Sequence, residues 1–366
     1  MPAQQYGLAP VLPIITYFNM INSIKSIFLI FILLGLQHPA FSQEKKIKVL
    51  QLNIWQEGRQ VPGGYEGIIS QITALQPDLV TLSEVGNNKT TNFANRIIND
   101  LKLKGKTYYS FSSNGAGLLS AYPIIDSAHV FEGKGEIYKL VTKINDQEIA
   151  VYSAHLDYLN YAVYLPRGYS GTTWKKLDQP VTDIPAILAD NLASARDEAI
   201  AAFIEAAKKD IQKGRLVFLG GDFNEASHLD WTAATKDKFD HNGLVIPWQN
   251  SLSLYKNGFK DSYRVKYPNP LKYPGFTFPA GNKDVPVKKL AWAPDADERE
   301  RIDFIYYYPN KQLKLENSYV VGPSMSVLRN EKVEETGSDI FIPPSGTWPT
   351  DHKGVMSVYV LLPLRR

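Results

Sequence analysis

Hydrophobic and polar residues alternate along several short stretches of the chain, which is the pattern of half-buried β-strands. The first stretch is residues 46–55, KIKVLQLNIW. Residues 65–75 follow with apolar positions at helical spacing, and this pattern ends just ahead of Pro77. Strand-like patterning returns at residues 78–85. We therefore predict that the folded chain begins with a strand, a helix and a second strand.

The same alternation continues through the rest of the sequence. Further strand-like runs occupy residues 117–120, 137–144, 148–154, 215–221, 301–308 and 355–362. Asn145 and Asp146 are typical of a hairpin turn between two of these runs. The longest helical pattern covers residues 187–212, and Gly214 follows it as a C-terminal glycine would. Two strand-rich halves that each carry helices predict an α/β fold.

Residues 158–186 break this regularity. The segment has little periodicity and is rich in tyrosine, glycine and proline. Loops of this length in a compact domain are usually functional or disordered. The segment begins three residues after His155, which follows the strand-like run 148–154. We therefore predict that it is an insertion, and that it lies on the substrate side of any site that includes His155.

The N-terminal region predicts a secretory signal peptide over residues 1–42. Residues 27–36, IFLIFILLGL, are preceded by Lys25 and followed by a polar stretch that ends in small residues. This apolar run is too short to span a bilayer. Met20 would itself begin a well-proportioned signal peptide, so residues 1–19 are read as an upstream extension without a fold of its own.

Residues 43–366 contain no long linker or visible repeat, so we predict a single domain there. We expect the mature protein to be secreted or periplasmic, to lack an integral membrane segment and to be a monomer. A lipid anchor would need a cysteine at the cleavage site, and the chain has none. Without cysteine, disulfides and thiolate metal sites are excluded, so any metal ion must use oxygen and imidazole ligands.

Composition adds a limit on the partners. The chain has 366 residues, of which 44% are hydrophobic, and its 40 basic and 37 acidic residues give a net charge of +3. This is an ordinary globular composition. A nucleic-acid partner is therefore not indicated by charge, although charge alone does not exclude one.

Polar side chains that bind metal ions or phosphate recur where the predicted strands end, which is where catalytic groups are commonly presented. They are Asn53, Glu84, His155, Asp222, Asn224, Asp303, Asp351 and His352. Taken singly, each has an ordinary structural explanation, such as a turn-forming asparagine or a solvated glutamate. Their order along the chain and the residues around them decide between these structural explanations and a functional site.

Seven stretches carry that order. They are QLNIW (51–55), PDLVTLSEV (77–85), GLLSAYPI (117–124), YSAHLD (152–157), LGGDFNE (219–225), RIDFIYY (301–307) and TDHKGV (350–355). With these motifs the chain resembles the endonuclease/exonuclease/phosphatase superfamily, which includes deoxyribonuclease I-like and neutral sphingomyelinase-like metal-dependent phosphoesterases. The resemblance covers nearly all of residues 46–362.

The resemblance implies a fold and a metal ion. The expected fold is a four-layer α/β sandwich, in which two mostly antiparallel sheets face each other with helices outside. Glu84 is the expected principal carboxylate ligand, with Asn53 and Asp351 near the same ion. The expected ion is Mg²⁺ or Mn²⁺, with Ca²⁺ as a further candidate.

The resemblance also implies the catalytic roles. His352 matches the catalytic histidine, and Asp303 is expected to hold it. Asp222 and Asn224 match the pair that orients the attacking water and binds phosphate oxygens, and His155 is expected beside the leaving group or the phosphate. Either His352 or Asp222 is able to take the proton of the water, so the choice of the base stays open.

Superfamily membership leaves the substrate undecided, because one core serves several phosphate esters. A phosphodiester or phosphomonoester, cleaved by in-line attack of an activated water, is the main expectation. The alternatives are a deoxyribonuclease-like endonuclease, a sphingomyelinase-like phospholipase and an inactive relative that only binds phosphate ligands. Residues 158–186 and 263–299 are the regions expected to distinguish these substrates.

Within the first of these regions we predict substrate contacts from Tyr158, Arg167 and Trp174. Aromatic rings beside basic groups stack on bases, cover sugars or surround choline cations, while the basic groups bind phosphate. An ordinary packed loop is the alternative. Asp157 is assigned either to metal or substrate contact or to anchoring of the loop.

Overall fold

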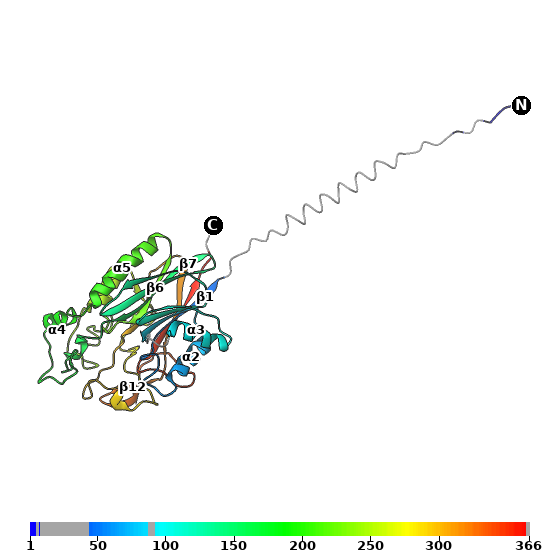
Figure 1. Ribbon diagram of the computed structural model, residues 1–366. Coiled ribbons are helices and arrows are strands. Elements are labelled where there is room, and N and C mark those ends of the chain that lie inside the picture. The colour runs from blue at the N-terminus through cyan, green and yellow to red at the C-terminus, as the bar shows by residue number, and fades with distance from the viewer. Residues whose placement is uncertain (5–6, 8–43, 87–91, 364–366) are drawn as a thin grey trace. The chain divides into compact units, whose positions relative to one another are not determined.

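The computed structural model describes residues 1–4, 7, 44–86 and 92–363 (Figure 1). Residues Met1–Gln43 and Glu44–Arg366 form separate units. The apolar run of the predicted signal peptide, residues 27–36, lies outside the described residues. Among the residues that are described, no helix has the length and apolar character needed to cross a bilayer.

Within the described residues, the helices and strands lie in the second unit. Its strands are β1 (Lys45–Asn53), β2 (Leu79–Val85), β3 (Tyr109–Ser112), β4 (Gly115–Ser120), β5 (Ile124–Phe131), β6 (Gly135–Ile144), β7 (Gln147–Leu156), β8 (Leu216–Asp222), β9 (Lys260–Asp261), β10 (Asp303–Tyr307), β11 (Leu313–Val321), β12 (Met325–Leu328), β13 (Glu331–Glu334), β14 (Phe341–Ile342) and β15 (Gly354–Leu361). Its helices are α2 (Gly64–Leu75), α3 (Phe93–Leu103), α4 (Ile184–Asn191), α5 (Arg196–Gln212), α6 (Gln249–Lys256) and α7 (Ser262–Lys266), with short 3₁₀ turns η1 (Ala162–Tyr164) and η2 (Val287–Lys289).

The strands form two large sheets and one small hairpin. The seven-stranded sheet has the order β14-β11-β15-β1-β2-β4-β3, and the six-stranded sheet has the order β5-β6-β7-β8-β10-β9. Most neighbours are antiparallel, but β1 and β2 run parallel, and so do β7 and β8, and β11 and β14. Strands β12 and β13 form the hairpin.

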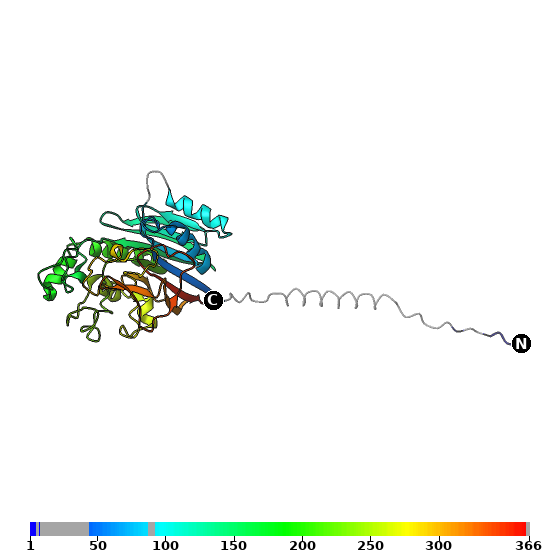
Figure 2. The ribbon, with the colours of Figure 1, turned by 90° about the horizontal axis from the view of Figure 1, so that it is seen from below.

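The two sheets pack face to face and are covered by helices on their outer sides. Val49 and Phe218 belong to the core between the sheets. Ile68 of α2 packs on the outer face of the seven-stranded sheet, and Phe203 of α5 packs on the outer face of the six-stranded sheet. In Figures 1 and 2, α5 lies on the opposite side of the sheets from α2 and α3. The predicted four-layer α/β sandwich is confirmed.

The helix predicted over residues 187–212 is wrong in one respect, because it is two helices. Helix α4 ends at Asn191 and α5 begins at Arg196. Side chains replace the helical hydrogen bond at the break, where the Asn191 carbonyl accepts from Ser194 Oγ at 2.8 Å and from Arg196 Nη2 at 3.3 Å. Helical periodicity continues across the break, so it gave no sign that side chains compete with the backbone for the Asn191 carbonyl.

Strand direction brings the candidate residues to one edge of the sandwich. His155 at the end of β7 pairs with Asp222 at the end of β8, and Asp222 pairs with Asp303 at the start of β10. Asn53 ends β1 in the facing sheet. β15 is antiparallel to β1, so His352, just before β15, lies at the same edge.

Candidate active site

His352 lies between two buried carboxylates. Its Nδ1 is 2.9 Å from Oδ2 of Asp303, and its Nε2 is 3.8 Å from Oδ2 of Asp222. Nδ2 of Asn53 is also 3.4 Å from Nε2, but Asn53 uses its two N–H groups to donate to Glu84 and Asp222. A neutral imidazole donates only one proton, whereas both nitrogens here face a carboxylate. This is the environment of an imidazolium.

The carboxylates beside His352 determine where the proton lies between His352 and Asp222. Burial alone would lower the pKa of His352, but the negative charges of Asp303 and Asp222 outweigh burial and raise the pKa to about 10. Burial raises the pKa of Asp222, and the nearby His352 opposes that rise. At neutral pH the proton therefore resides on His352 rather than on Asp222.

Asn53 joins the two sheets at the site. Its Nδ2 donates to Oε1 of Glu84 at 3.0 Å and to Oδ2 of Asp222 at 2.9 Å. Its Oδ1 accepts from the backbone N–H of Trp55 at 2.8 Å, which fixes the orientation of the amide. One amide therefore holds a carboxylate from each sheet at a set separation.

Glu84 is directed by an irregularity in β2. Its φ is +60°, and the register of β2 against β4 shifts between Ser83 and Val85. A β-bulge re-aims the side chain of the extra residue. Glu84 and Asp351 line the same cavity, where burial and the charge of Glu84 raise the pKa of Asp351 to about 7.

Two groups of side chains have the donor chemistry for a divalent cation. Glu84 and Asp351 are acids that repel each other at the cavity, which suits a hard cation that keeps part of its water shell. Asp222, Asp303 and His352 also have ligand atoms within 4.8 Å of one another. In that second group, however, Asp303 is already hydrogen-bonded to His352, and an ion would break this contact. The first group is therefore the better fit.

Buried polar residues behind the site hold its carboxylates, and the sequence analysis did not single them out. Gln51 Nε2 donates to Oγ of Ser83 at 3.1 Å and to Oδ1 of Asp303 at 3.3 Å. Oγ of Ser83 accepts from the backbone N–H of Asp222 at 3.0 Å, and Oγ1 of Thr277 accepts from that of Asp303 at 3.1 Å. Gln51 and Ser83 occupy polar positions in strands that contain other polar residues, such as Lys48 and Thr81, so the sequence pattern gave no sign of their contacts.

A cavity of about 570 Å³ opens over these groups, within the size range of small-molecule sites. Asn53 and Asp303 do not line it and instead lie behind Asp222 and His352. Asn224 lines it with φ +46°, and its Nδ2 donates to the Leu156 carbonyl at 3.0 Å. The predicted residues that line the cavity are Glu84, His155, Tyr158, Trp174, Asp222, Asn224, Asp351 and His352.

One side of the cavity is aromatic. Tyr158 and Trp174, both from residues 158–186, have stacked rings with centroids 6.1 Å apart. Trp292, from residues 263–299, also lines the cavity, with its ring centroid 5.7 Å from that of Trp174. The sequence analysis did not name Trp292, because one tryptophan in a segment without periodicity carries no signal of its position.

Asp157 anchors the start of the aromatic segment. Its Oδ1 accepts from the backbone N–H of Leu159 at 3.0 Å, and its Oδ2 accepts from that of Ala195 at 3.3 Å. Its carbonyl accepts from Nη1 of Arg196, a buried arginine that the sequence analysis missed, at 2.7 Å. Because Asp157 does not line the cavity, the structure favours loop anchoring among the two roles predicted for it.

Arg167 lies away from the cavity, which corrects its prediction as a substrate contact. Its guanidinium is buried, and Nη2 is 2.7 Å from Oε1 of Glu300. Nη1 donates to the Val163 carbonyl at 3.3 Å, and Nη2 donates to the Phe239 carbonyl at 3.1 Å. Burial raises the pKa of Glu300 to about 7, although Arg167 lowers it. Arg167 therefore stabilises the segment from inside the fold.

Replacement of Arg167 by alanine is expected to destabilise the protein by about 3 to 5 kcal/mol, because it leaves Glu300 buried without its charged partner. Urea unfolding measures this loss. Lys176→Ala is the matched control, since its 2.7 Å ion pair with Asp295 is exposed, and its unfolding midpoint should not move. An unchanged midpoint for Arg167→Ala, together with a raised KM, would restore the substrate role.

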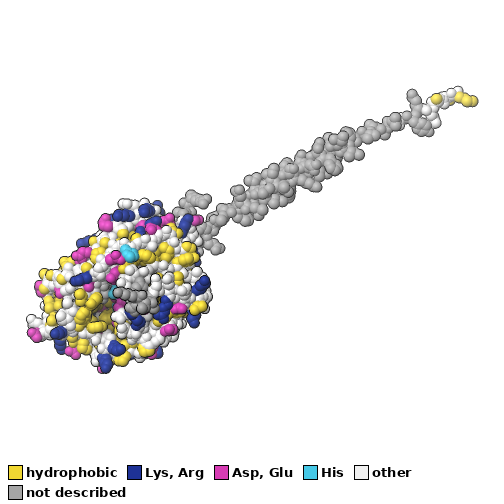
Figure 3. Space-filling view, viewed as in Figure 1, with side chains coloured by type: hydrophobic (Ala, Val, Ile, Leu, Met, Phe, Trp, Pro, Cys, Tyr) yellow, Lys and Arg dark blue, Asp and Glu magenta, His cyan; other side chains and the backbone are white. Residues whose placement is uncertain are grey.

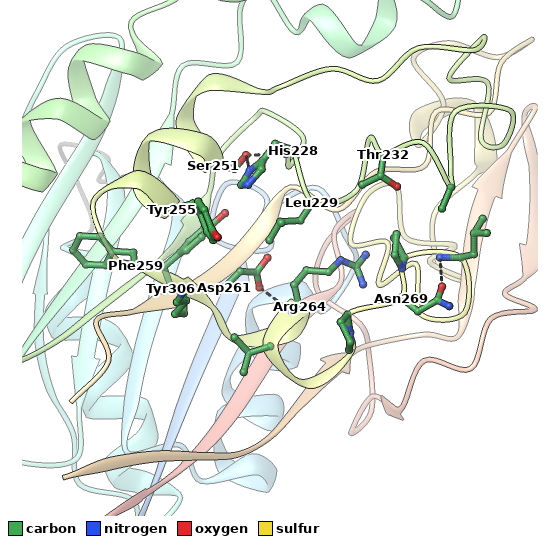
Figure 4. A pocket seen from close by; sticks show the side chains of 16 residues that line it. His228, Leu229, Thr232, Ser251, Tyr255, Phe259, Asp261, Arg264, Asn269 and Tyr306 are labelled. Atoms are coloured by element: carbon green, nitrogen blue, oxygen red, sulfur yellow. Dashed lines mark hydrogen bonds between the residues drawn. The ribbon is translucent and has the colours of Figure 1, made fainter. Parts of the chain in front are cut away.

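A larger cavity of about 660 Å³ lies elsewhere, and none of the predicted site residues lines it (Figure 4). His228 and Ser251 lie at one side of it, with Nδ1 of His228 2.8 Å from Oγ of Ser251. Asp261 also lines it, but its carboxylate forms an ion pair with buried Arg301 at 2.6 Å. The smaller cavity is therefore the one with the groups for phosphate chemistry.

Comparison with known proteins agrees with this placement. The Endonuclease/Exonuclease/phosphatase family matches residues 50–352, a span that contains every candidate residue from Asn53 to His352. A protein of Caenorhabditis elegans described as uncharacterized is 28% identical over 275 residues, which cover 73% of this chain and 80% of that protein.

Solved structures are more distant in sequence. TDP2 of D. rerio, complexed with a single-strand DNA product, is 14% identical with a TM-score of 0.47, over 86% of this chain and 99% of that one. A Leptotrichia buccalis endonuclease/exonuclease/phosphatase family protein is 18% identical with a TM-score of 0.47, over 85% and 98%. The human Nocturnin catalytic domain with bound sulfate is 13% identical with a TM-score of 0.46, over 87% and 96%.

Proposed function

We propose, on the premise that this chain belongs to the Endonuclease/Exonuclease/phosphatase family, that it is a secreted, divalent-metal-dependent phosphoesterase. It hydrolyses a phosphodiester or phosphomonoester by in-line attack of water. The observation that carries the proposal is the position of His352, whose two nitrogens face Asp303 and Asp222 at the base of a cavity lined by further acids and a second histidine.

The proposed chemistry follows from the charge of the substrate. A phosphate ester is anionic and repels nucleophiles, so a catalyst must supply positive charge, align a water and protonate the leaving oxygen. His352 supplies positive charge as an imidazolium. It cannot also accept the proton of the water, because an imidazolium has no lone pair for it.

Asp222 is therefore the proposed base. Its carboxylate is buried, lies beside His352 and is fixed by the Asn53 amide at 2.9 Å. Burial raises the pKa of Asp222, which makes the carboxylate a stronger proton acceptor than a solvated one. This assigns the base that the sequence left open between His352 and Asp222.

The remaining lining residues have roles around the phosphate. His155 lies near the end of β7, and Asn224 follows the end of β8 by two residues, at the same edge of the six-stranded sheet. We assign His155 to protonation of the leaving oxygen, and the second N–H of Asn224 to a phosphate oxygen, because its first N–H donates to the Leu156 carbonyl.

Glu84 and Asp351, with Asn53 holding Glu84, are the residues that would hold Mg²⁺ or Mn²⁺. Such an ion supplies Lewis-acid stabilisation of the negative charge that develops on the phosphate oxygens. Burial and the charge of Glu84 raise the pKa of Asp351, so a bound cation would offset the repulsion between their negative charges at this cavity. The chain contributes the charge and the orientation of these ligands.

Export is proposed from the sequence of residues 1–42 alone. The apolar run of ten residues after a lysine supports it. N-terminal sequencing of protein from the growth medium or periplasm should begin near residue 43. An intact N-terminus on protein that stays inside the cell would contradict export.

The reaction is tested by incubating purified protein with Mg²⁺ or Mn²⁺ in ¹⁸O-labelled water. The panel is bis(p-nitrophenyl) phosphate, p-nitrophenyl phosphate, plasmid DNA and sphingomyelin. We expect hydrolysis of at least one ester, with one solvent oxygen on the phosphorus of the product. Absence of hydrolysis across the panel would instead support an inactive phosphate-binding relative.

A further inference from the structure

We propose that Trp292, together with Trp174 and Tyr158, forms a binding site for an uncharged ring carried on one side of the scissile phosphate. The ring is that of a nucleoside or of a sugar. This inference rests on the proposed function, because it names what the same cavity binds beyond the phosphate. These three residues are called the aromatic wall below.

The aromatic wall presents ring surface to solvent inside the cavity. Tyr158 is 55% exposed and Trp292 is 44% exposed. The Tyr158 and Trp174 rings are inclined by only 20°, and the Trp292 ring is tilted by 48° from Trp174. Neighbouring exposed aromatic rings in a concave site are typical of binding surfaces, because leaving them in water costs free energy that a ligand recovers.

Buried polar contacts hold the two segments of the wall against each other. Oε2 of Glu298 accepts from the Tyr164 hydroxyl at 2.8 Å and from the backbone N–H of Trp292 at 3.0 Å. The Tyr169 hydroxyl accepts from the backbone N–H of Asp295 at 3.2 Å. Hydrogen bonds therefore join residues 158–186 to the segment around Trp292. The exposed rings are held in position before a ligand binds.

The ligand on the wall carries no second phosphate, because the described residues that line the cavity include neither lysine nor arginine to neutralise it. On the face seen in Figure 3, basic side chains are scattered among acidic and hydrophobic ones. A methylated ammonium held between two rings needs about 4 Å to each face, hence rings about 8 Å apart. The Tyr158 and Trp174 centroids are closer than that, at 6.1 Å, so a methylated ammonium does not fit between these two rings. The exposed ring surfaces of Tyr158 and Trp292 are then the ones on which a ligand ring stacks.

The test compares phosphate diesters that each carry one methyl group. The methyl group has no ring, so only the second group of each diester is able to bind the aromatic wall. Methyl thymidine 5′-phosphate, methyl glucose 6-phosphate, methyl phosphocholine and ethyl methyl phosphate are tested as competitive inhibitors of bis(p-nitrophenyl) phosphate hydrolysis with Mn²⁺. We expect the inhibition constant of the nucleoside or the sugar diester to be at least about tenfold lower than that of ethyl methyl phosphate. Whichever of the two binds more tightly identifies the source of the ring.

Variants connect this preference to the wall. Trp292→Ala should abolish this preference and Trp292→Phe should keep most of it, with far-ultraviolet circular dichroism showing that each variant folds. Tyr255→Ala is the matched control, because Tyr255 is 51% exposed but does not line this cavity.

Three results would overturn the inference. Equal inhibition by ring-bearing and ringless diesters, with hydrolysis intact, overturns the ring site and leaves the proposed function standing. Tightest inhibition by methyl phosphocholine identifies a cation site instead. Absence of hydrolysis of every ester in the panel overturns the proposed function and this inference with it.

Discussion

Replacement of His352 by alanine is expected to lower kcat for bis(p-nitrophenyl) phosphate by at least about a hundredfold, with KM changed much less. The reason is electrostatic. The imidazolium stands between Asp303 and Asp222, so its removal leaves two negative groups where the anionic substrate must bind. Asp222→Ala should cause a loss of similar size, because it removes the proposed proton acceptor.

The matched control for this experiment is His129→Ala. His129 also lies beside a carboxylate, with Nδ1 2.5 Å from Oε1 of Glu132, but the pair is exposed on β5. Its removal should leave kcat unchanged. Far-ultraviolet circular dichroism and the melting temperature show whether each variant folds. A folded His352→Ala protein with near-normal turnover would remove His352 from the proposed chemistry.

Replacement of Glu84 by glutamine is expected to abolish most activity and to weaken Mn²⁺ binding by at least about tenfold, while the protein stays folded. Glutamine keeps the shape of the side chain and removes the charge that a hard cation needs. The Asn53 amide, which donates to Oε1 of Glu84 at 3.0 Å, is able to donate to the glutamine oxygen as well. Structural damage should therefore be small.

Calorimetric titration with Mn²⁺ and the rate of ester hydrolysis measure the two effects separately. Glu66→Gln, an exposed acid in the first turn of α2, is the control and should change neither. If Glu84→Gln binds Mn²⁺ as the original protein does, the ion is held by other residues, and the trio of Asp222, Asp303 and His352 becomes the next candidate.

Most of the site could be predicted because its residues follow strand ends. Asn53, Glu84, His155 and Asp222 each end a strand or lie within a residue of its end, and parallel pairing brings such ends together. Strand patterns and motifs are both visible in the sequence without knowledge of contacts between distant residues. The bulge that directs Glu84 was not visible, because the pattern of residues 78–85 is that of an uninterrupted strand.

Long-range contacts explain what the sequence could not predict. Arg167 and Trp174 lie in one segment and look alike as ligand-binding residues, yet Arg167 is buried against Glu300, far along the chain, and Trp174 lines the cavity. The break between α4 and α5 depends on Arg196, which reaches both Asn191 and Asp157. No periodicity within one segment reports such partners.

The measurement that tests the central claim most directly is the metal dependence of hydrolysis by the unaltered protein. Bis(p-nitrophenyl) phosphate is incubated with protein in EDTA, and Mn²⁺ or Mg²⁺ is then added in excess. We expect negligible release of p-nitrophenol in chelator and restored release after either ion is added. Full release in EDTA, or failure of both ions to support hydrolysis of any ester in the panel, would contradict a metal-dependent phosphoesterase built on Glu84, Asp222 and His352.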